Sequence, residues 1–229
     1  MSQTIEHIKK LFPKAEPFDQ VLQDYYTKML RVHGLLVENT LAAVSVCPDE
    51  LNNQVVKQIG RLFGAPFLLG GLAGFPFSGE SGFSAFGDHI PDGGTGVIFF
   101  GPHVGINEHQ PLGYIKRRGQ QRSTVACDSL LNAYHEITGT SPSNKFEDDY
   151  QQEAVKQMLT DKLHLIPNDD PELPLLDLLF DESHDFIVRQ ANRIKGQFNL
   201  NGVVLLGAII INTPADIADC LDVRCFEVI

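Results

Sequence analysis

Apolar side chains follow two kinds of pattern along this chain, and the two alternate. Residues 4–33 carry apolar side chains at helical spacing, interrupted by Pro13 and Pro17, which predicts helices at the N-terminus. Residues 40–47 form a short, β-leaning apolar run that predicts a strand. Residues 50–63 then show an amphipathic pattern, which predicts a helix directly after that strand.

The rest of the chain continues this alternation. A second apolar run over residues 97–101 predicts another strand. Three helices and two strands are then predicted, over residues 124–137, 148–166, 172–196, 202–213 and 222–228. Such alternation favours an α/β fold with a central, mostly parallel sheet flanked by helices on both faces. We expect an N-terminal helical arm over residues 1–38 and one α/β domain over residues 39–229.

A glycine-rich block separates the first two predicted strands. Its sequence, LLGGLAGFPFSGESGFSAFGDHIPDGGTG, favours tight turns, because glycine permits backbone angles that other residues rarely adopt. The block contains no G-x-x-x-x-G-K-[ST] phosphate-binding loop. Its apolar residues, such as Leu72, Phe75, Phe83 and Phe86, could line a dry pocket or belong to the core.

Composition and charge narrow the classes of function. The formal net charge is −11, with 18 basic and 29 acidic residues, and an acidic surface repels phosphate backbones, so we expect no nucleic-acid partner. No run approaches the roughly 20 apolar residues of a membrane helix, and the N-terminus lacks an apolar signal core. We expect no membrane partner and a soluble, cytoplasmic protein, in which 4 cysteines do not suggest a disulfide scaffold.

Two cysteines and a histidine occupy positions that could converge on a metal ion. Cys47 ends the first predicted strand, His103 follows the second, and Cys127 lies near the start of a helix. Ligand sites of such sheets lie beyond the carboxyl ends of the strands, and catalytic zinc commonly takes three protein ligands and one open position. No C-x-x-C or H-E-x-x-H motif occurs, so each cysteine could equally be a small buried apolar residue.

Longer stretches of sequence are typical of one family. The words LGGLAGFPFSGESGFSAF, DHIPDGG, FFGPHVGIN, RRGQQRSTVAC and GAIIINT resemble the limiting-carbon-dioxide-inducible B/C family, also called theta-class carbonic anhydrases. The resemblance covers roughly residues 40–229. It implies a fold and zinc site similar to those of β-class carbonic anhydrases, reversible hydration of carbon dioxide to bicarbonate and a proton, and a homodimer.

The resemblance also implies roles for individual residues. Cys47, His103 and Cys127 match the Zn²⁺ ligands, and Asp49 matches the aspartate two residues after the first ligand. An ionised carboxylate only accepts hydrogen bonds, so Asp49 would orient a zinc-bound hydroxide toward carbon dioxide. If Asp49 instead bound the zinc, it would fill the open position and switch the enzyme off.

Two further catalytic roles are expected. The β class places an arginine two residues after the aspartate, where this chain has Leu51. We expect Arg117, in the segment leading to Cys127, to hold Asp49 away from the metal, with Arg118 as second choice and a surface role for Arg117 as the alternative. Proton release needs a group that titrates near neutrality, and we expect His89 to serve, although it could be a hydrogen-bonded loop residue.

Other functions remain open at this point. An inactive zinc-binding homologue, acting as a bicarbonate sensor or assembly subunit, is favoured by Leu51 and by Asp128, which stands where similar sequences have glycine. Asp128 could equally be an acid at a helix N-terminus. A zinc deaminase would need H-x-E with P-C-x-x-C, but Val104 and Gly105 follow His103 and no C-x-x-C exists. A metal-free globular protein would require the family resemblance to be accidental.

Overall fold

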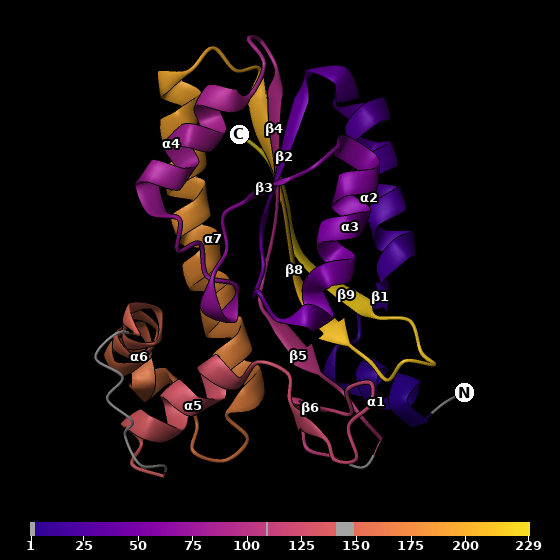
Figure 1. The fold of residues 1–229 in the computed structure, drawn as a ribbon, viewed down its shortest axis with the longest axis vertical. Coiled ribbons are helices and arrows are strands. Elements are labelled where there is room, and N and C mark those ends of the chain that lie inside the picture. The colour runs from indigo at the N-terminus through magenta and orange to yellow at the C-terminus, as the bar shows by residue number, and fades with distance from the viewer. Residues whose placement is uncertain (1–2, 109, 141–148) are drawn as a thin grey trace.

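A sheet with helices on both of its faces forms the body of the molecule (Figure 1). The computed structural model describes residues 3–108, 110–140 and 149–229. In these residues the sheet has seven strands, in the order β1-β9-β8-β4-β2-β3, with β5 paired to β8. Its strands are β1 (Glu16–Pro17), β2 (Thr40–Ser45), β3 (Phe67–Leu68), β4 (Thr95–Phe100), β5 (His103–Gly105), β8 (Gly202–Asn212) and β9 (Cys220–Val228).

Most of the strand pairs are parallel. The β2–β3, β2–β4, β4–β8 and β5–β8 pairs are parallel, and β9 is antiparallel to both β8 and β1. A separate two-stranded ribbon joins β6 (Tyr114–Ile115) to β7 (Thr124–Val125). The mostly parallel sheet flanked by helices confirms the fold class expected from the sequence.

Each face of the sheet is covered by a pair of helices. In Figure 1, α4 (Gly79–His89) and α7 (Glu172–Gln197) lie on one side, and α2 (Phe18–Val32) and α3 (Asn53–Phe63) lie on the other. Successive residues of a strand point to opposite faces, so Phe99 packs in the α2–α3 core and Phe100 in the α4–α7 core. Because both faces are buried, these strands are continuous apolar runs rather than alternating ones.

The remaining helices lie toward the end of the sheet at which β5 is found (Figure 1). They are α1 (Gln3–Leu11), α5 (Asp128–Ile137) and α6 (Tyr150–Lys162). Short 3-10 helices are η1 (Val37–Asn39), η2 (Glu50–Asn52), η3 (Leu72–Gly74) and η4 (Leu163–Leu165). Across the described ranges, no helix combines the length and apolar character that crossing a membrane requires.

The N-terminal segment packs into the same layers as the rest of the chain. Strand β1 pairs with the start of β9, and the buried Phe12 and Phe18 belong to two of the apolar cores. The helices expected within residues 4–33 are therefore present as α1 and α2, and they share their apolar contacts with residues 39–229.

Helix α4 lies inside the glycine-rich block, where the pattern indicates only turns. Glycine lowers intrinsic helix propensity, so the local sequence hides this helix. Burial stabilises it, because Phe83 and Phe86 are fully enclosed in the α4–α7 core. A Cβ atom on Gly87 would lie 3.0 Å from Cβ of Ile194 on α7 and 2.8 Å from the ring of Phe198 at its end, so glycine lets α4 approach α7 closely. The fold thus places Phe83 and Phe86 in the core rather than around a pocket.

Candidate metal centre

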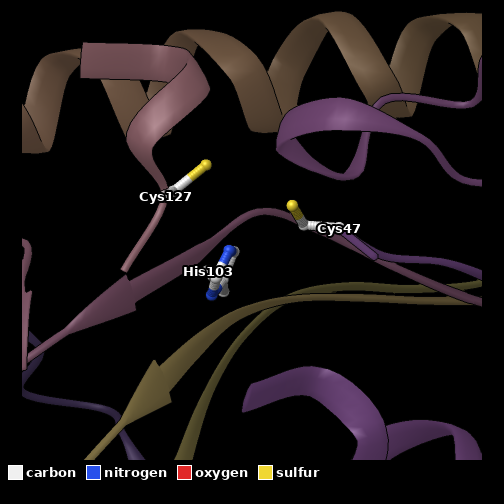
Figure 2. Close-up of side chains that lie close together, drawn as sticks. All are labelled: Cys47, His103 and Cys127. Carbon is white, nitrogen blue, oxygen red and sulfur yellow. The ribbon is translucent and has the colours of Figure 1, made fainter. Parts of the chain in front are cut away.

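Cys47, His103 and Cys127 meet beyond the carboxyl ends of the parallel strands (Figure 2). Their ligand atoms all lie within 4.8 Å of one another. All three side chains are buried, and His103 is fully inaccessible to solvent. The structure therefore brings together the three residues that the sequence offers as metal ligands.

The sheet register explains why residues from separate strands converge. Ser45 and Phe100 are paired at the carboxyl ends of β2 and β4, so Cys47 and His103 follow these ends at the same end of the sheet. His103 there begins β5, which pairs with β8. Gly101 lets β4 pass directly into β5. Its φ is +151°, and a Cβ atom there would lie 1.8 Å from the Ala208 carbonyl oxygen. Only glycine fits this approach, which sets the position of His103.

Cys127 reaches the group from another direction. It is the N-cap of α5, and it follows β7, which pairs with β6. The helix expected over residues 124–137 therefore starts later than its pattern suggests, because Thr124 and Val125 are held in the ribbon. Asp128, the first residue of α5, is exposed, as expected for an acid in the first turn of a helix.

One hydrogen bond orients the imidazole of His103, and the other ring nitrogen is free to bind a metal ion. Its Nδ1 lies 2.9 Å from Oδ1 of Asn212. With the amide oriented so that its oxygen accepts, Nδ1 donates and Nε2 carries the lone pair. Nε2 is buried without a hydrogen-bond partner. A buried nitrogen without a partner, beside two thiols, is what a metal ion in this group would satisfy.

The pKa shifts of the three side chains indicate that the group would bind a cation. Interaction with Cys127 lowers the pKa of Cys47 to about 4, with His103 acting in the same direction and burial opposing both. Cys47 in turn raises the pKa of Cys127 well above its usual value, and burial adds to that shift. Burial lowers the pKa of His103, but contacts with Cys47 outweigh it and the net direction is upward. A divalent cation would replace the shared protons.

Asn212 is itself anchored, which makes it a positioning residue for His103. Its Nδ2 lies 3.5 Å from Oδ2 of Asp219, and the backbone N–H of Thr213 donates to Oδ1 of Asp219 at 2.8 Å. The sequence words include Asn212 in GAIIINT, but no spacing rule marks it as a neighbour of His103, from which it is 109 residues distant. Its contact with His103 arises from the parallel β5–β8 pairing, where Gly105 faces Asn212.

Replacing Asn212 with Ala is expected to weaken zinc binding about 10- to 100-fold, because loss of the group that orients a histidine ligand typically has that effect. The affinity is measured by competition with a chromophoric chelator. Asn192→Ala is the matched control, since Asn192 is exposed on α7, where its side chain donates to the Val188 carbonyl. Equal zinc affinities for the two variants would contradict the role of Asn212.

Asp49 lies next to the group and is held through both carboxylate oxygens. Its Oδ2 accepts from an Nη of Arg117 at 2.6 Å, and its Oδ1 accepts from the backbone N–H of Leu51 at 2.9 Å. Burial raises the pKa of Asp49, while the Leu51 N–H, His103 and Arg117 work to lower it. At the position where the β class carries arginine, Leu51 thus contributes its backbone N–H.

Arg117 connects Asp49 to the segment that carries Cys127. Besides Asp49, its guanidinium pairs with Glu50 at 2.6 Å. It also donates to the carbonyls of Val125 and Ala126, at 2.9 and 3.3 Å. Arg117 is the arginine that we expected from the sequence as the partner of Asp49. Arg118, the second candidate, is exposed.

The structure does not bring His89 to this group. His89 is the exposed last residue of α4, and its ring lies 6.0 Å from that of Phe67. The chain then enters β4 at Thr95, which pairs with Thr40 at the amino ends of the strands. The length of β2, roughly 20 Å at 3.3 Å per residue, separates that edge from Cys47. The expected proton shuttle at His89 is therefore not supported.

An apolar pocket adjoins the metal-binding group. Its cavity volume is about 20 Å³, and His103 and Cys127 form part of its wall. Its apolar lining comes from Val104, Val125, Leu130, Leu131 and Leu176. From the sequence, the apolar residues of the glycine-rich block could line such a pocket or belong to the core. The residues that line it could not be predicted, because their patterns mark them only as parts of strands and helices.

The sequence of this chain fits the model of one family over residues 15–229. That family is described as limiting CO2-inducible proteins B/C, β carbonic anhydrases. The chain belongs to this family. The match includes Cys47, His103, Cys127, Asp49 and Arg117, and it extends beyond the N-terminal limit of the resemblance seen in the sequence words.

The chain is also similar to solved structures of proteins related to this family. The chain is 31% identical to a histidine-to-alanine mutant of PtLCIB4, described as a homolog of the limiting CO2-inducible protein LCIB, with a TM-score of 0.89 over 99% of this chain and 94% of that one. Unmodified PtLCIB4 matches at 31% identity and a TM-score of 0.87, over 98% of this chain and 94% of that one.

The limiting CO2-inducible protein LCIB itself is a more distant match. At 15% identity and a TM-score of 0.72, over 100% of this chain and 99% of that one, it shows a shared fold. No curated protein matches the sequence.

Proposed function

We propose that this member of the family is a zinc carbonic anhydrase, which converts carbon dioxide and water reversibly to bicarbonate and a proton. The observation that carries the proposal is the buried group of Cys47, His103 and Cys127, with the unpartnered Nε2 of His103, beside an Asp49 carboxylate held by Arg117. The family description as carbonic anhydrases supports it.

The donor set fits zinc. Two sulfurs and one imidazole nitrogen are typical zinc ligands, and three protein ligands leave one position open, as catalytic zinc sites do. Cys47, His103 and Cys127 would hold the ion, and their two thiolates would balance its charge. Zinc in such a site supplies a Lewis acid that brings the pKa of water near ~7.

Asp49 would orient the reacting water. As a carboxylate it accepts hydrogen bonds and cannot donate them, so a water that binds it must do so through an O–H group. That arrangement turns an oxygen lone pair away from Asp49 and toward a substrate. The bonds from Arg117 and the Leu51 N–H each use one lone pair of the carboxylate and leave others available.

Arg117 would keep the site open. By holding Oδ2 of Asp49, it would restrain the carboxylate from filling the position that the three ligands leave open on the metal. The apolar pocket beside His103 and Cys127 would exclude water and admit the uncharged substrate. The proton released by hydration then passes to solvent or buffer, since His89 lies at the other end of the strands.

Removing zinc is expected to abolish hydration and restoring it to recover the rate. Protein purified without chelators is assayed for carbon dioxide hydration by stopped-flow with a pH indicator, and its metal content is measured on the same sample. The assay is repeated after chelation and again after adding Zn²⁺. Zinc without hydration would contradict the enzyme and favour a binding or assembly role. Protein that takes up no zinc would contradict the ligand assignment.

A further inference from the structure

A second cluster of metal-ligating side chains lies outside the centre described above. It consists of His184 on α7 and of Cys225 and Glu227 on β9, whose ligand atoms all lie within 4.8 Å of one another. Residues 225 and 227 are two apart on a strand, so both side chains point to the same face of the sheet, toward α7. Strand β8 lies between β9 and β5, the strand that carries His103. Cys225 and His103 also pair with different residues of β8, Gly207 and Ile210, so the two clusters are distinct.

The backbone around Cys225 is shaped locally. Gly207 faces Cys225 on β8, but the next residue, Ala208, faces Val223, so Arg224 is an extra residue in β9. Such a β-bulge bends a strand and redirects its side chains. A Cβ atom on Gly207 would lie 2.7 Å from Sγ of Cys225, so the thiol lies directly against the bare backbone of β8.

The imidazole of His184 is fixed by its neighbours. Its ring stacks on Phe180 with an interplanar angle of 9°, and on Phe100 with an angle of 22°. Its Nε2 lies 2.8 Å from Oε1 of Glu227, and its Nδ1 lies 3.8 Å from the carboxylate of Asp185. The fold thus holds the ring and the carboxylate close together, which lowers the entropic cost of binding a metal ion between them.

The three donors suit a zinc-like cation. They offer one imidazole nitrogen, one sulfur and one carboxylate oxygen, each a common ligand of zinc. Burial raises the pKa of the Cys225 thiol to about 11, so a metal ion binds there by displacing the thiol proton to solvent. The exposed Asp185 adds negative charge nearby, while the neighbouring cation Arg224 is paired with Asp177 and Asp222.

We propose that His184, Cys225 and Glu227 form a second metal site, for zinc or a similar divalent transition metal, that links the last strand to α7. Within the described residues, β1 pairs with β9 only at Leu221 and Cys220. The part of β9 that carries Cys225 and Glu227 therefore has a strand neighbour on one side, β8. A metal ion held between β9 and α7 would fasten this edge of the sheet. The site is structural and does not depend on the proposed hydration activity.

The test is the number of metal ions that each chain binds. Metal-free protein is titrated with Co²⁺, whose bonds to thiolates give a near-ultraviolet charge-transfer absorption, and the count is repeated with Zn²⁺ by elemental analysis after gel filtration. We expect two equivalents per chain for the natural sequence and one for Cys225→Ala. Cys220→Ala is the control, because Cys220 is also a free cysteine on β9 but belongs to neither cluster, and it should keep both equivalents.

A second pair of variants distinguishes the loss of one metal site from misfolding of the whole protein. Cys47→Ala leaves the second cluster intact and should retain one equivalent, whereas Glu227→Gln should lose the second equivalent and keep the rate of carbon dioxide hydration. One equivalent in the natural sequence, unchanged in Cys225→Ala and Glu227→Gln, would overturn the proposal. Two equivalents together with no hydration would contradict the proposed enzyme and support the second site.

Discussion

Cys47→Ala is expected to remove zinc from the candidate centre and to lower carbon dioxide hydration at least about 1000-fold. The variant leaves His103 and Cys127 as a two-ligand site, and zinc sites of this kind need three protein ligands. Without the metal, the pKa of water returns from near ~7 toward its bulk value, and the nucleophile becomes scarce at neutral pH. Stopped-flow hydration and zinc content, measured on the same sample, check both parts of the expectation.

Cys220→Ala provides the matched control for this loss. Cys220 is another free cysteine, its thiol hydrogen-bonds to the Ala218 carbonyl, and it stands apart from the metal-binding group. This variant should keep the natural rate and the natural zinc content. Hydration that survives in Cys47→Ala at the natural rate would mean that the reaction takes place elsewhere on the protein.

Asp49→Asn is expected to keep zinc and to lower kcat for hydration by about 100-fold or more, because a reacting group that loses its productive orientation costs on that order. The asparagine amide is nearly the same size as the carboxylate, so the metal ligands keep their places. The amide can donate as well as accept, so it no longer fixes which way the reacting water points. The measurement is kcat by stopped-flow, with zinc content as the check on the site.

Arg117→Lys separates the orientation of Asp49 from its charge. Lysine keeps the positive charge but lacks the planar fork that reaches Asp49, Glu50 and the Val125 carbonyl together. We expect a smaller loss than in Asp49→Asn, on the order of 10- to 100-fold, with zinc retained. If Asp49→Asn hydrated carbon dioxide at the natural rate, this result would contradict the proposed role of Asp49 and therefore also that of Arg117.

Much of the architecture can be predicted from the sequence, because a buried parallel strand is a continuous apolar run whatever surrounds it. The runs at 40–47, 97–101 and 202–213 correspond to β2, β4 and β8, with ends that differ by a few residues. Helix α4 could not be predicted in this way. Its glycines oppose a helix locally, and only the burial of its phenylalanines against α7 stabilises one.

The metal-ligating residues of the candidate centre could also be predicted from the sequence. Two cysteines and a histidine at strand ends and at the start of a helix suggest a metal-binding site. The sequence motifs shared with the family identify the same three residues as ligands. The partners of these residues are a different matter. Asp49 and Arg117 are 68 residues apart, and the sequence offered Arg118 as well. The structure distinguishes them, because Arg117 alone of the two reaches the carbonyls that precede Cys127.

The sequence by itself thus determined the class of fold, the types of metal ligand and the family resemblance, since these depend on local periodicity and on short sequence motifs. Tertiary structure alone decided that Asn212 orients His103, that His89 lies at the far end of the strands, and that His184 meets Cys225 and Glu227. The physical reason is that such contacts depend on strand register, on close approach at glycines such as Gly101 and on the bulge at Arg224. These features join segments distant in sequence, and no local spacing encodes them.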